Sequence, residues 1–187
     1  MISKIQLKRK DGSVIFEYEA EDNSVKKTLE VYIKEERESN KGIIYLRFAD
    51  LNNTDLTDAD LSYADLSFAD LNNTDLTDAD LSNADLSFAN LSYTDLRYAD
   101  LTSAELFNAD IHGSNLREAN FTKANLSYAN LGEDDLRETN FTKANLTYAN
   151  LIGTDLSHTI LNYTDLTNIN RIDYDFKRIM KTFSNNK

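Results

Sequence analysis

A unit of five residues repeats without insertion or deletion through most of this chain, and it limits the possible folds more than any other feature. The repeat starts A-D-L-N-N, T-D-L-T-D at Ala49 and continues to Asn168. We call the third residue of each unit its centre. The 24 centres run from Leu51 to Leu166, and 21 of them are leucine; the others are Ile111, Phe121 and Phe141. Alanine or threonine stands two residues before the centre in 22 units, and Asp or Asn stands one residue before it in 22.

A period of five fits neither regular secondary structure. On an α-helix, five residues advance the centre by about 140°, so the leucines would wrap around the whole surface. On a flat strand, successive centres would alternate between the two faces because five is odd. A short extended piece and a corner in every unit keep all centres on the axis of a coil. The small residue two positions earlier then also points inward.

Internal duplications predict the number of sides of this coil. Residues 51–70 and 71–90 are identical at 18 of 20 positions, and residues 121–140 and 141–160 at 13 of 20. Twenty residues are four units, so one turn has four sides. The 24 units then make about six coils, roughly 29 Å long at a strand spacing of about 4.8 Å.

The units A-D-L-S-Y (59–63), A-D-L-S-F (64–68) and A-N-L-S-Y (124–128) resemble the A(D/N)LXX consensus of the pentapeptide repeat family. The resemblance covers about 120 of the 187 residues. It implies an all-β solenoid, a right-handed quadrilateral parallel β-helix, which we expect over residues 46–170. The handedness follows from the resemblance and not from the spacing.

The flank at 1–45 is expected to form a hairpin and a helix that cap the open end of the coil. Asp11-Gly12 is a typical hairpin turn between two alternating segments. Asn23 or Ser24 can cap a helix that ends near Arg37. Its apolar face is formed by Val25, Leu29, Tyr32 and Ile33. Ile44 and Leu46 already follow the phase of the repeat, so the coil should begin early. Many phage and bacterial proteins of the family begin with a similar segment.

The flank at 171–187 breaks the repeat and favours a short amphipathic helix. Apolar residues recur there at helical spacing: Ile172, Phe176, Ile179, Met180 and Phe183. The helix can serve as a lid on the last coil or as a dimerisation helix. The resemblance supports the second alternative, because gyrase-binding members of the family form a two-fold dimer through a C-terminal element.

Charge is distributed unevenly along the coil. The chain has a formal charge of −12, and residues 49–110 alone contain 14 acidic side chains and one basic one, Arg97. The Asp/Asn position is almost entirely Asp in this part and almost entirely Asn over 115–150. Both residue types can bond nearby backbone amides and tolerate corner conformations, which is a structural interpretation. The alternative is a surface that binds another macromolecule, formed by Asp55, Asp60, Asp65, Asp75, Asp80, Asp85 and Asp95.

An aromatic column is predicted near one corner of the coil. Phe68, Phe88, Tyr128 and Tyr148 each lie two residues after a centre and are spaced by whole coils, with Asn108 and Asn168 interrupting the column. Such rings can stabilise a corner by stacking. Exposed aromatic patches also mark interfaces, so the column is a candidate contact for a partner or for a second copy.

The sequence favours a non-catalytic structural or protein-binding module and not an enzyme. It has no cysteine, and its two histidines, His112 and His158, belong to different coils and different sides. We therefore expect no catalytic site, no cofactor and no metal. No apolar run suggests a signal peptide or a membrane span, and we expect a cytoplasmic protein. The partner should be a macromolecule, most simply a protein, and direct nucleic-acid binding is not expected.

A second function class follows from the density of acidic charge. Over residues 49–110 it is at least that of duplex DNA, which carries about one charge per 1.7 Å. Gyrase-binding members of the family are thought to act as DNA mimics. The alternative function is therefore that of an inhibitor or protector of a type II topoisomerase.

Overall fold

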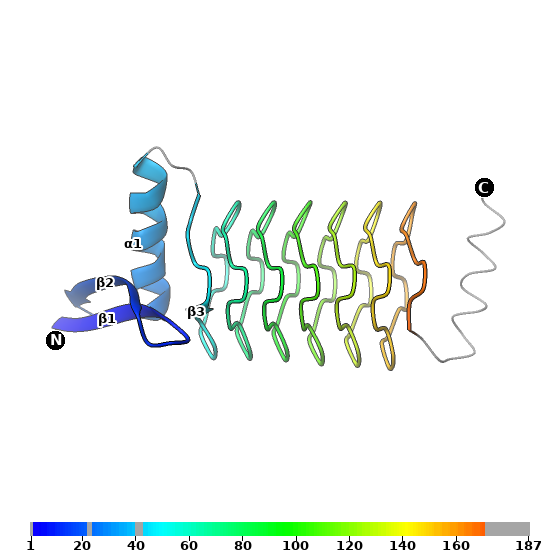
Figure 1. Cartoon of the computed structure of the whole chain (residues 1–187), viewed down its shortest axis with the longest axis horizontal. Coiled ribbons are helices and arrows are strands. Elements are labelled where there is room, and N and C mark those ends of the chain that lie inside the picture. The colour runs from blue at the N-terminus through cyan, green and yellow to red at the C-terminus, as the bar shows by residue number, and fades with distance from the viewer. Residues whose placement is uncertain (1, 22–23, 40–42, 171–187) are drawn as a thin grey trace.

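The repeat forms a column whose backbone pairs with itself every 20 residues. The computed structural model describes residues 2–21, 24–39 and 43–170. Parallel bridges join residues 20 positions apart, from Tyr45–Asp65 to Asn150–Asn170. Each turn therefore contains four five-residue units, the spacing that the duplications predict. Figure 1 shows these turns stacked along the long axis of the molecule, and they form a repeat solenoid.

The axis of the column is filled by the centres. Every centre from Leu51 to Leu151 is at most 1% exposed, and the alanines two residues before the centres are buried beside them. Phe121 and Phe141 lie one above the other with ring centroids 5.1 Å apart. Burying a leucine side chain contributes about 1.5–3 kcal/mol. The repeated leucine is thus the main source of stability of the coil.

The corners have left-handed backbone at an unexpected position. All residues two after a centre, from Phe48 to Asn168, have positive φ. Most of them lie in a β-turn that is closed by a backbone hydrogen bond. The N–H of the next inward residue donates to the carbonyl of the centre, as Ala59 N does to Leu56 O at 3.1 Å. The tolerance of Asp and Asn for corner conformations is therefore not what places them at their position, whereas their bonds to nearby backbone amides are present. Those residues form the bridges between turns, and the left-handed residue follows three positions later.

The N-terminal segment covers the first turn of the column (Figure 1). Strands β1 (Ile2–Arg9) and β2 (Val14–Glu21) form an antiparallel hairpin, and helix α1 spans Val25–Glu38. Strand β1 also pairs with β3 (Ala49–Asp50), which is part of the first turn. The sheet order is therefore β2-β1-β3. The hairpin joins the coil by main-chain hydrogen bonds, which satisfy part of its open edge.

Helix α1 starts at the cap that the sequence predicts. The Ser24 hydroxyl accepts a hydrogen bond from Lys27 N at 3.1 Å. Leu29, Tyr32 and Ile33 are buried, and the Tyr32 hydroxyl donates to the Tyr45 carbonyl at 3.1 Å. Ile44 and Leu46 are fully buried, and Leu46 N donates to Asp65 O. The coil therefore begins before Ala49, as expected.

The predicted amphipathic helix with Ile172, Phe176, Ile179 and Phe183 falls outside the described residues. In the described part of the chain, no helix has the length and apolar character needed to cross a bilayer.

Candidate interaction surface

The Asp/Asn position has a structural task that does not depend on charge. In one half of the coil, the Asp75 and Asp80 carboxylates accept hydrogen bonds through Oδ1 from the backbone N–H two residues later, at 3.0 and 2.9 Å. In the other half, Asn145 and Asn140 accept the same bond through Oδ1, both at 3.0 Å. These hydrogen bonds fix the backbone where each corner begins. Because an amide oxygen does this as well as a carboxylate, the coil itself does not require the charge.

The seven carboxylates of the predicted surface lie on three sides of the coil. Bridges between turns place Asp55, Asp75 and Asp95 in one ladder. Asp60 and Asp80 form part of a second ladder, and Asp65 and Asp85 part of a third. The seven side chains thus surround the first turns as an acidic belt and do not share one flat face.

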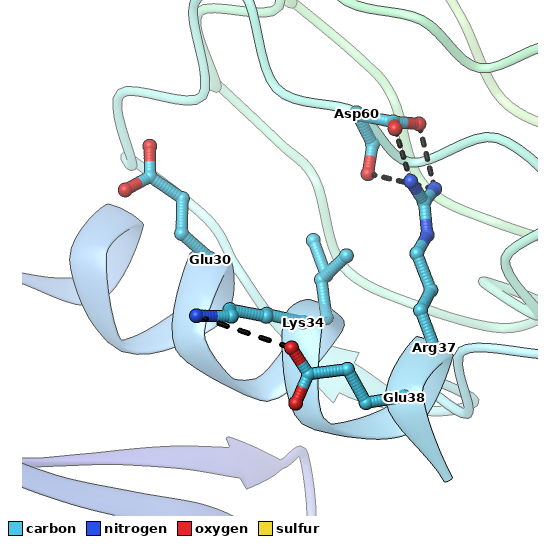
Figure 2. Close-up of a pocket in the computed structure, with 6 residues that line it drawn as sticks. Glu30, Lys34, Arg37, Glu38 and Asp60 are labelled. Carbon is cyan, nitrogen blue, oxygen red and sulfur yellow. Dashed lines mark hydrogen bonds and ion pairs between the residues drawn. The ribbon is translucent and has the colours of Figure 1, made fainter.

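Two carboxylates of the acidic belt are engaged by helix α1. Figure 2 shows the Arg37 guanidinium bonded to both carboxylate oxygens of Asp60, at 2.7 Å for Nη2 to Oδ1. This contact lowers the pKa of Asp60 to about 2. Lys26 Nζ lies 3.8 Å from Asp55 Oδ1. The Thr57 N–H that bonds Asp55 lowers the pKa of that carboxyl, and Lys26 adds to the effect.

Helix α1 and Asp60 also line a shallow depression on this side of the molecule. Its lining residues are Glu30, Ile33, Lys34, Arg37, Glu38 and Asp60. Within it Lys34 Nζ lies 3.9 Å from Glu38 Oε1 (Figure 2). The contact of α1 with the acidic belt was not predicted from the sequence. A signal was available, since Lys26 and Arg37 are 11 residues apart and therefore share one face of a helix.

The remaining carboxylates of the belt differ in their partners. Asp95 is paired with Arg97, whose Nη2 lies 2.8 Å from Asp95 Oδ2. Across residues 2–21, 24–39 and 43–170, no cation lies within ion-pair distance of Asp75, Asp80 or Asp85. These three carboxylates, and Asp65, which also has no ion pair in the described chain, are partly exposed on three sides of the coil and are the part of the belt that a partner can engage directly.

The aromatic column is continuous over its length. The stacked pairs Phe68–Phe88 and Tyr128–Tyr148 have ring centroids 4.9 and 4.8 Å apart. Our expectation that Asn108 interrupts the column is wrong, because Phe107 occupies the gap. Its ring makes edge contacts with Phe88 at 5.4 Å and Tyr128 at 5.6 Å. Phe107 is one position out of phase with the other rings, so counting whole coils did not find it.

Phe48, which the sequence places in the same phase as the four predicted residues, extends the aromatic column by one turn. Phe48 stacks on Phe68 with centroids 5.1 Å apart. The guanidinium carbon of Arg47 lies 5.0 Å from the Phe48 centroid and 5.1 Å from the Phe68 centroid. We call the six rings Phe48, Phe68, Phe88, Phe107, Tyr128 and Tyr148 the ring ladder.

One buried carboxyl interrupts the inward column of small residues. Asp134 stands two residues before a centre and is 2% exposed. Its Oδ1 accepts a hydrogen bond from Ser114 N at 2.8 Å, whereas its Oδ2 is buried without a partner in the described chain. Burial raises the pKa of Asp134 to about 8. Among the described residues, no three His, Asp or Glu side chains gather as metal ligands would.

The repeat is detected by a family model. The model for pentapeptide repeats matches the chain in eight copies, over residues 44–78, 71–106, 79–117, 104–133 and 135–170. These ranges cover nearly all of the described coil. No curated protein matches the chain.

Several solved structures match the chain. A pentapeptide repeat protein from the Arabidopsis thaliana thylakoid lumen is 31% identical over 54% of this chain and 72% of its own, with a TM-score of 0.49. The pentapeptide repeat protein Rfr23 of the cyanobacterium Cyanothece 51142 is 22% identical over 76% and 98%, with a TM-score of 0.45. QnrB1, a plasmid-mediated fluoroquinolone resistance protein, is 19% identical over 76% and 89% in a trypsin-treated variant, with a TM-score of 0.32.

Proposed function

Since this chain belongs to the pentapeptide repeat family, we propose that it is a non-catalytic module whose coil presents an acidic surface to another macromolecule. The scaffold in this proposal is a right-handed quadrilateral β-helix of about six coils, with the handedness that the family resemblance implies. The partner is a protein with a basic contact surface. The acidic belt forms the contact, and Asp75, Asp80 and Asp85 are among its most available carboxylates.

The observation that carries this proposal is the equivalence of Asp and Asn in the coil. Asp80 and Asn140 lie in the same ladder and accept the same backbone hydrogen bond. Yet carboxylates stacked one turn apart without a cation beside them in the described chain, such as Asp65 and Asp85, repel each other at a strand spacing of about 4.8 Å. The charge of such carboxylates therefore adds repulsion between turns, whereas the corner forms with either residue. A contact with a basic partner gives a reason to retain it.

The proposal is tested by removing the free charges without changing the corners. A variant with Asp75, Asp80 and Asp85 replaced by Asn keeps an oxygen at each backbone contact. Its control carries Asp135, Asp155 and Asp165→Asn, which removes the same charge from the other half. Each protein is immobilised and exposed to a lysate of the source organism at low and at high salt.

We expect the wild type and the control to retain the same partner at low salt and to release it at high salt. The Asp75, Asp80 and Asp85 variant should not retain it. If all three proteins retain identical sets of proteins, the acidic belt is not the contact surface.

A DNA-mimic function is the second candidate, and the charge density favours it. One turn, residues 70–89, contains the carboxylates Asp70, Asp75, Asp78, Asp80 and Asp85 and no basic residue. With a rise of about 4.8 Å per turn, this is about one charge per 1 Å, compared with about one per 1.7 Å in duplex DNA. A gyrase supercoiling assay tests it. Inhibition of gyrase, or its protection from quinolones, at micromolar protein supports the DNA-mimic function if it is lost in the variant with Asp75, Asp80 and Asp85 replaced by Asn. If the wild type has no effect on gyrase, the DNA-mimic function is rejected.

A further inference from the structure

The ring ladder exposes aromatic surface along one corner of the coil. Phe48, Phe88 and Phe107 are 40%, 43% and 37% exposed. The centroid distances of 4.9 to 5.1 Å between Phe48, Phe68 and Phe88 exceed the contact distance of about 3.5–4.0 Å between carbon atoms. The stacked rings are therefore displaced sideways, and part of each ring face is left uncovered.

The two halves of the ladder have different flanks. In the first half, one of the two sides that meet at this corner contributes Asp65, Asp85 and Glu105, and the other contributes Asp70, Asn90 and Asp110. In the second half, Tyr128 and Tyr148 are flanked by Asn125, Asn145, Asn130 and Asn150. Asp65 and Asp85 bond their corners through Oδ1, so Oδ2 of each can accept from a partner. Only the first half combines rings with carboxylates.

Arg47 shows which chemical group the rings of the ladder accept. Its guanidinium lies about equally far from the Phe48 and Phe68 rings, at 5.0 and 5.1 Å. A planar guanidinium stacks on aromatic faces and donates to carboxylates at the same time, which an ammonium group does less well. The chain's own arginine thus lies on the first ring pair, Phe48 and Phe68, and arginines of a partner would use the later rings.

The spacing of the rings sets the spacing of the ligand groups. Phe48, Phe68 and Phe88 are 5.1 and 4.9 Å apart in succession, so alternate rings are about 10 Å apart. An extended or polyproline-type peptide rises about 3.1–3.4 Å per residue. Three residues of such a peptide therefore match two steps of the ladder.

We propose that the acid-flanked half of the ring ladder, Phe48, Phe68, Phe88 and Phe107, docks an extended protein segment with two arginines three residues apart. The inference rests on the proposed binding function and names the partner's chemistry. A second copy of this chain would bring the same carboxylates to the contact and be repelled. Nucleic acid and anionic lipid surfaces are repelled for the same reason.

The test uses two peptides of nine residues with equal charge. One has arginine at positions 4 and 7 and serine elsewhere, and the other has lysine at those positions. The main variant carries Phe68→Asn and Phe88→Asn. Asn fits these left-handed corners, because Asn73, Asn83 and Asn108 have the same backbone conformation. The control carries Tyr128→Asn and Tyr148→Asn in the amide-flanked half.

We expect the arginine peptide to bind the wild type and the control about tenfold more tightly than the lysine peptide. In the Phe68 and Phe88 variant the two peptides should bind equally. Circular dichroism melting of each variant verifies that it is folded, and Phe88→Asn alone should give an intermediate preference if the double variant is not.

Two outcomes overturn the inference, and they separate it from the proposed function. In the first outcome both peptides bind in a salt-sensitive way, but the preference for arginine is absent, or it is still present in the Phe68 and Phe88 variant. The acidic belt then remains the contact surface, and the ring ladder does not bind the arginines. If neither peptide binds while the lysate experiment still yields a partner that depends on Asp75, Asp80 and Asp85, the arginine segment is wrong and the proposed function remains. If the lysate experiment also yields no partner that depends on these carboxylates, the proposed function is rejected.

Discussion

At the scale of single residues, Leu86 shows how strictly the inward position is defined. It is a centre midway along the column and is fully buried. Leu86→Asp loses the burial of the leucine, about 2–5 kcal/mol, and places an unpaired carboxylate in an apolar axis at further cost. Because this is comparable with the whole stability of a typical domain, we expect the variant to be unfolded at 25 °C by circular dichroism.

The control for Leu86→Asp is Asn83→Asp. It adds the same charge at an outward corner, where Asp58 and Asp78 already occur with the same backbone conformation. This variant should melt within a few degrees of the wild type. An unchanged melting curve for Leu86→Asp would mean that the centres do not face the axis.

Asp134 is expected to make stability depend on pH in an uncommon range. Its pKa is about 8 in the folded chain, above the ordinary value of 3.8. The folded state therefore binds an extra proton between these values, and stability decreases as the pH rises from about 4 to about 8. The full effect is on the order of 5 kcal/mol.

Asp134→Thr provides the matched test of this pH dependence. Thr74 and Thr94 occupy equivalent positions in the same ladder and donate to the carbonyl oxygens of Leu51 and Leu71. Urea denaturation at pH 5 and pH 9 should show the wild type to be less stable at pH 9. Asp134→Thr should have nearly the same stability at both. An equal loss in both proteins would assign the pH effect to other groups.

The burial of individual residues could be predicted from the sequence because it depends on side-chain polarity and on the period of the repeat. The buried positions of Leu51 and Ala59 follow from their apolar character and period. The left-handed corners did not follow, because Phe68, Lys123 and Tyr148 have no local preference for positive φ. Hydrogen bonds to the next turn hold them there, such as Phe68 N to Ser87 O at 3.0 Å.

At the scale of secondary structure elements, the attachment of α1 is the main finding that the sequence did not reveal. The hairpin turn at Asp11-Gly12 and the cap at Ser24 are local signals and were predicted. The contact of Arg37 with Asp60 joins residues that are 23 positions apart. The spacing of Lys26 and Arg37 places both on one face of the helix, but which carboxylate this face meets depends on how the helix packs. The out-of-phase Phe107 was missed for a similar reason.

We predict that Arg37→Gln loosens α1 without unfolding the coil. A partly exposed, bidentate arginine–carboxylate pair contributes about 1 kcal/mol. Amide hydrogen exchange within Val25–Glu38 should become several times faster, whereas exchange in the leucine column should be unchanged. Lys34→Gln is the control, because the pair of Lys34 with Glu38 lies within the helix. Equal exchange in Arg37→Gln and Lys34→Gln would mean that the Asp60 contact does not hold α1.

At the scale of the whole molecule, the ends of the column are expected to control assembly. The hairpin covers the first turn through β1–β3 pairing, and the sequence predicts a lid or a dimerisation helix in residues 171–187. Deleting residues 172–187 should therefore alter the oligomeric state or promote aggregation, because exposed strand edges pair with other chains. Light scattering that finds the same soluble species before and after the deletion would contradict both alternatives.

The charge of the column divides the molecule into an acidic half and a nearly neutral half that share one backbone geometry. This equivalence is the basis of the proposed function, and it has a direct consequence for stability. Replacing Asp75, Asp80 and Asp85 by Asn keeps an acceptor for each corner bond, seen in the wild type at 2.9 to 3.0 Å. It also removes the repulsion between stacked carboxylates.

The most direct measurement is the thermal unfolding midpoint of this triple variant at low salt, compared with that of the wild type. We predict a midpoint equal to or higher than that of the wild type, with a smaller dependence on added salt. A clearly lower midpoint would show that the coil itself needs these carboxylates, and the charge of the acidic belt would then no longer indicate a binding surface.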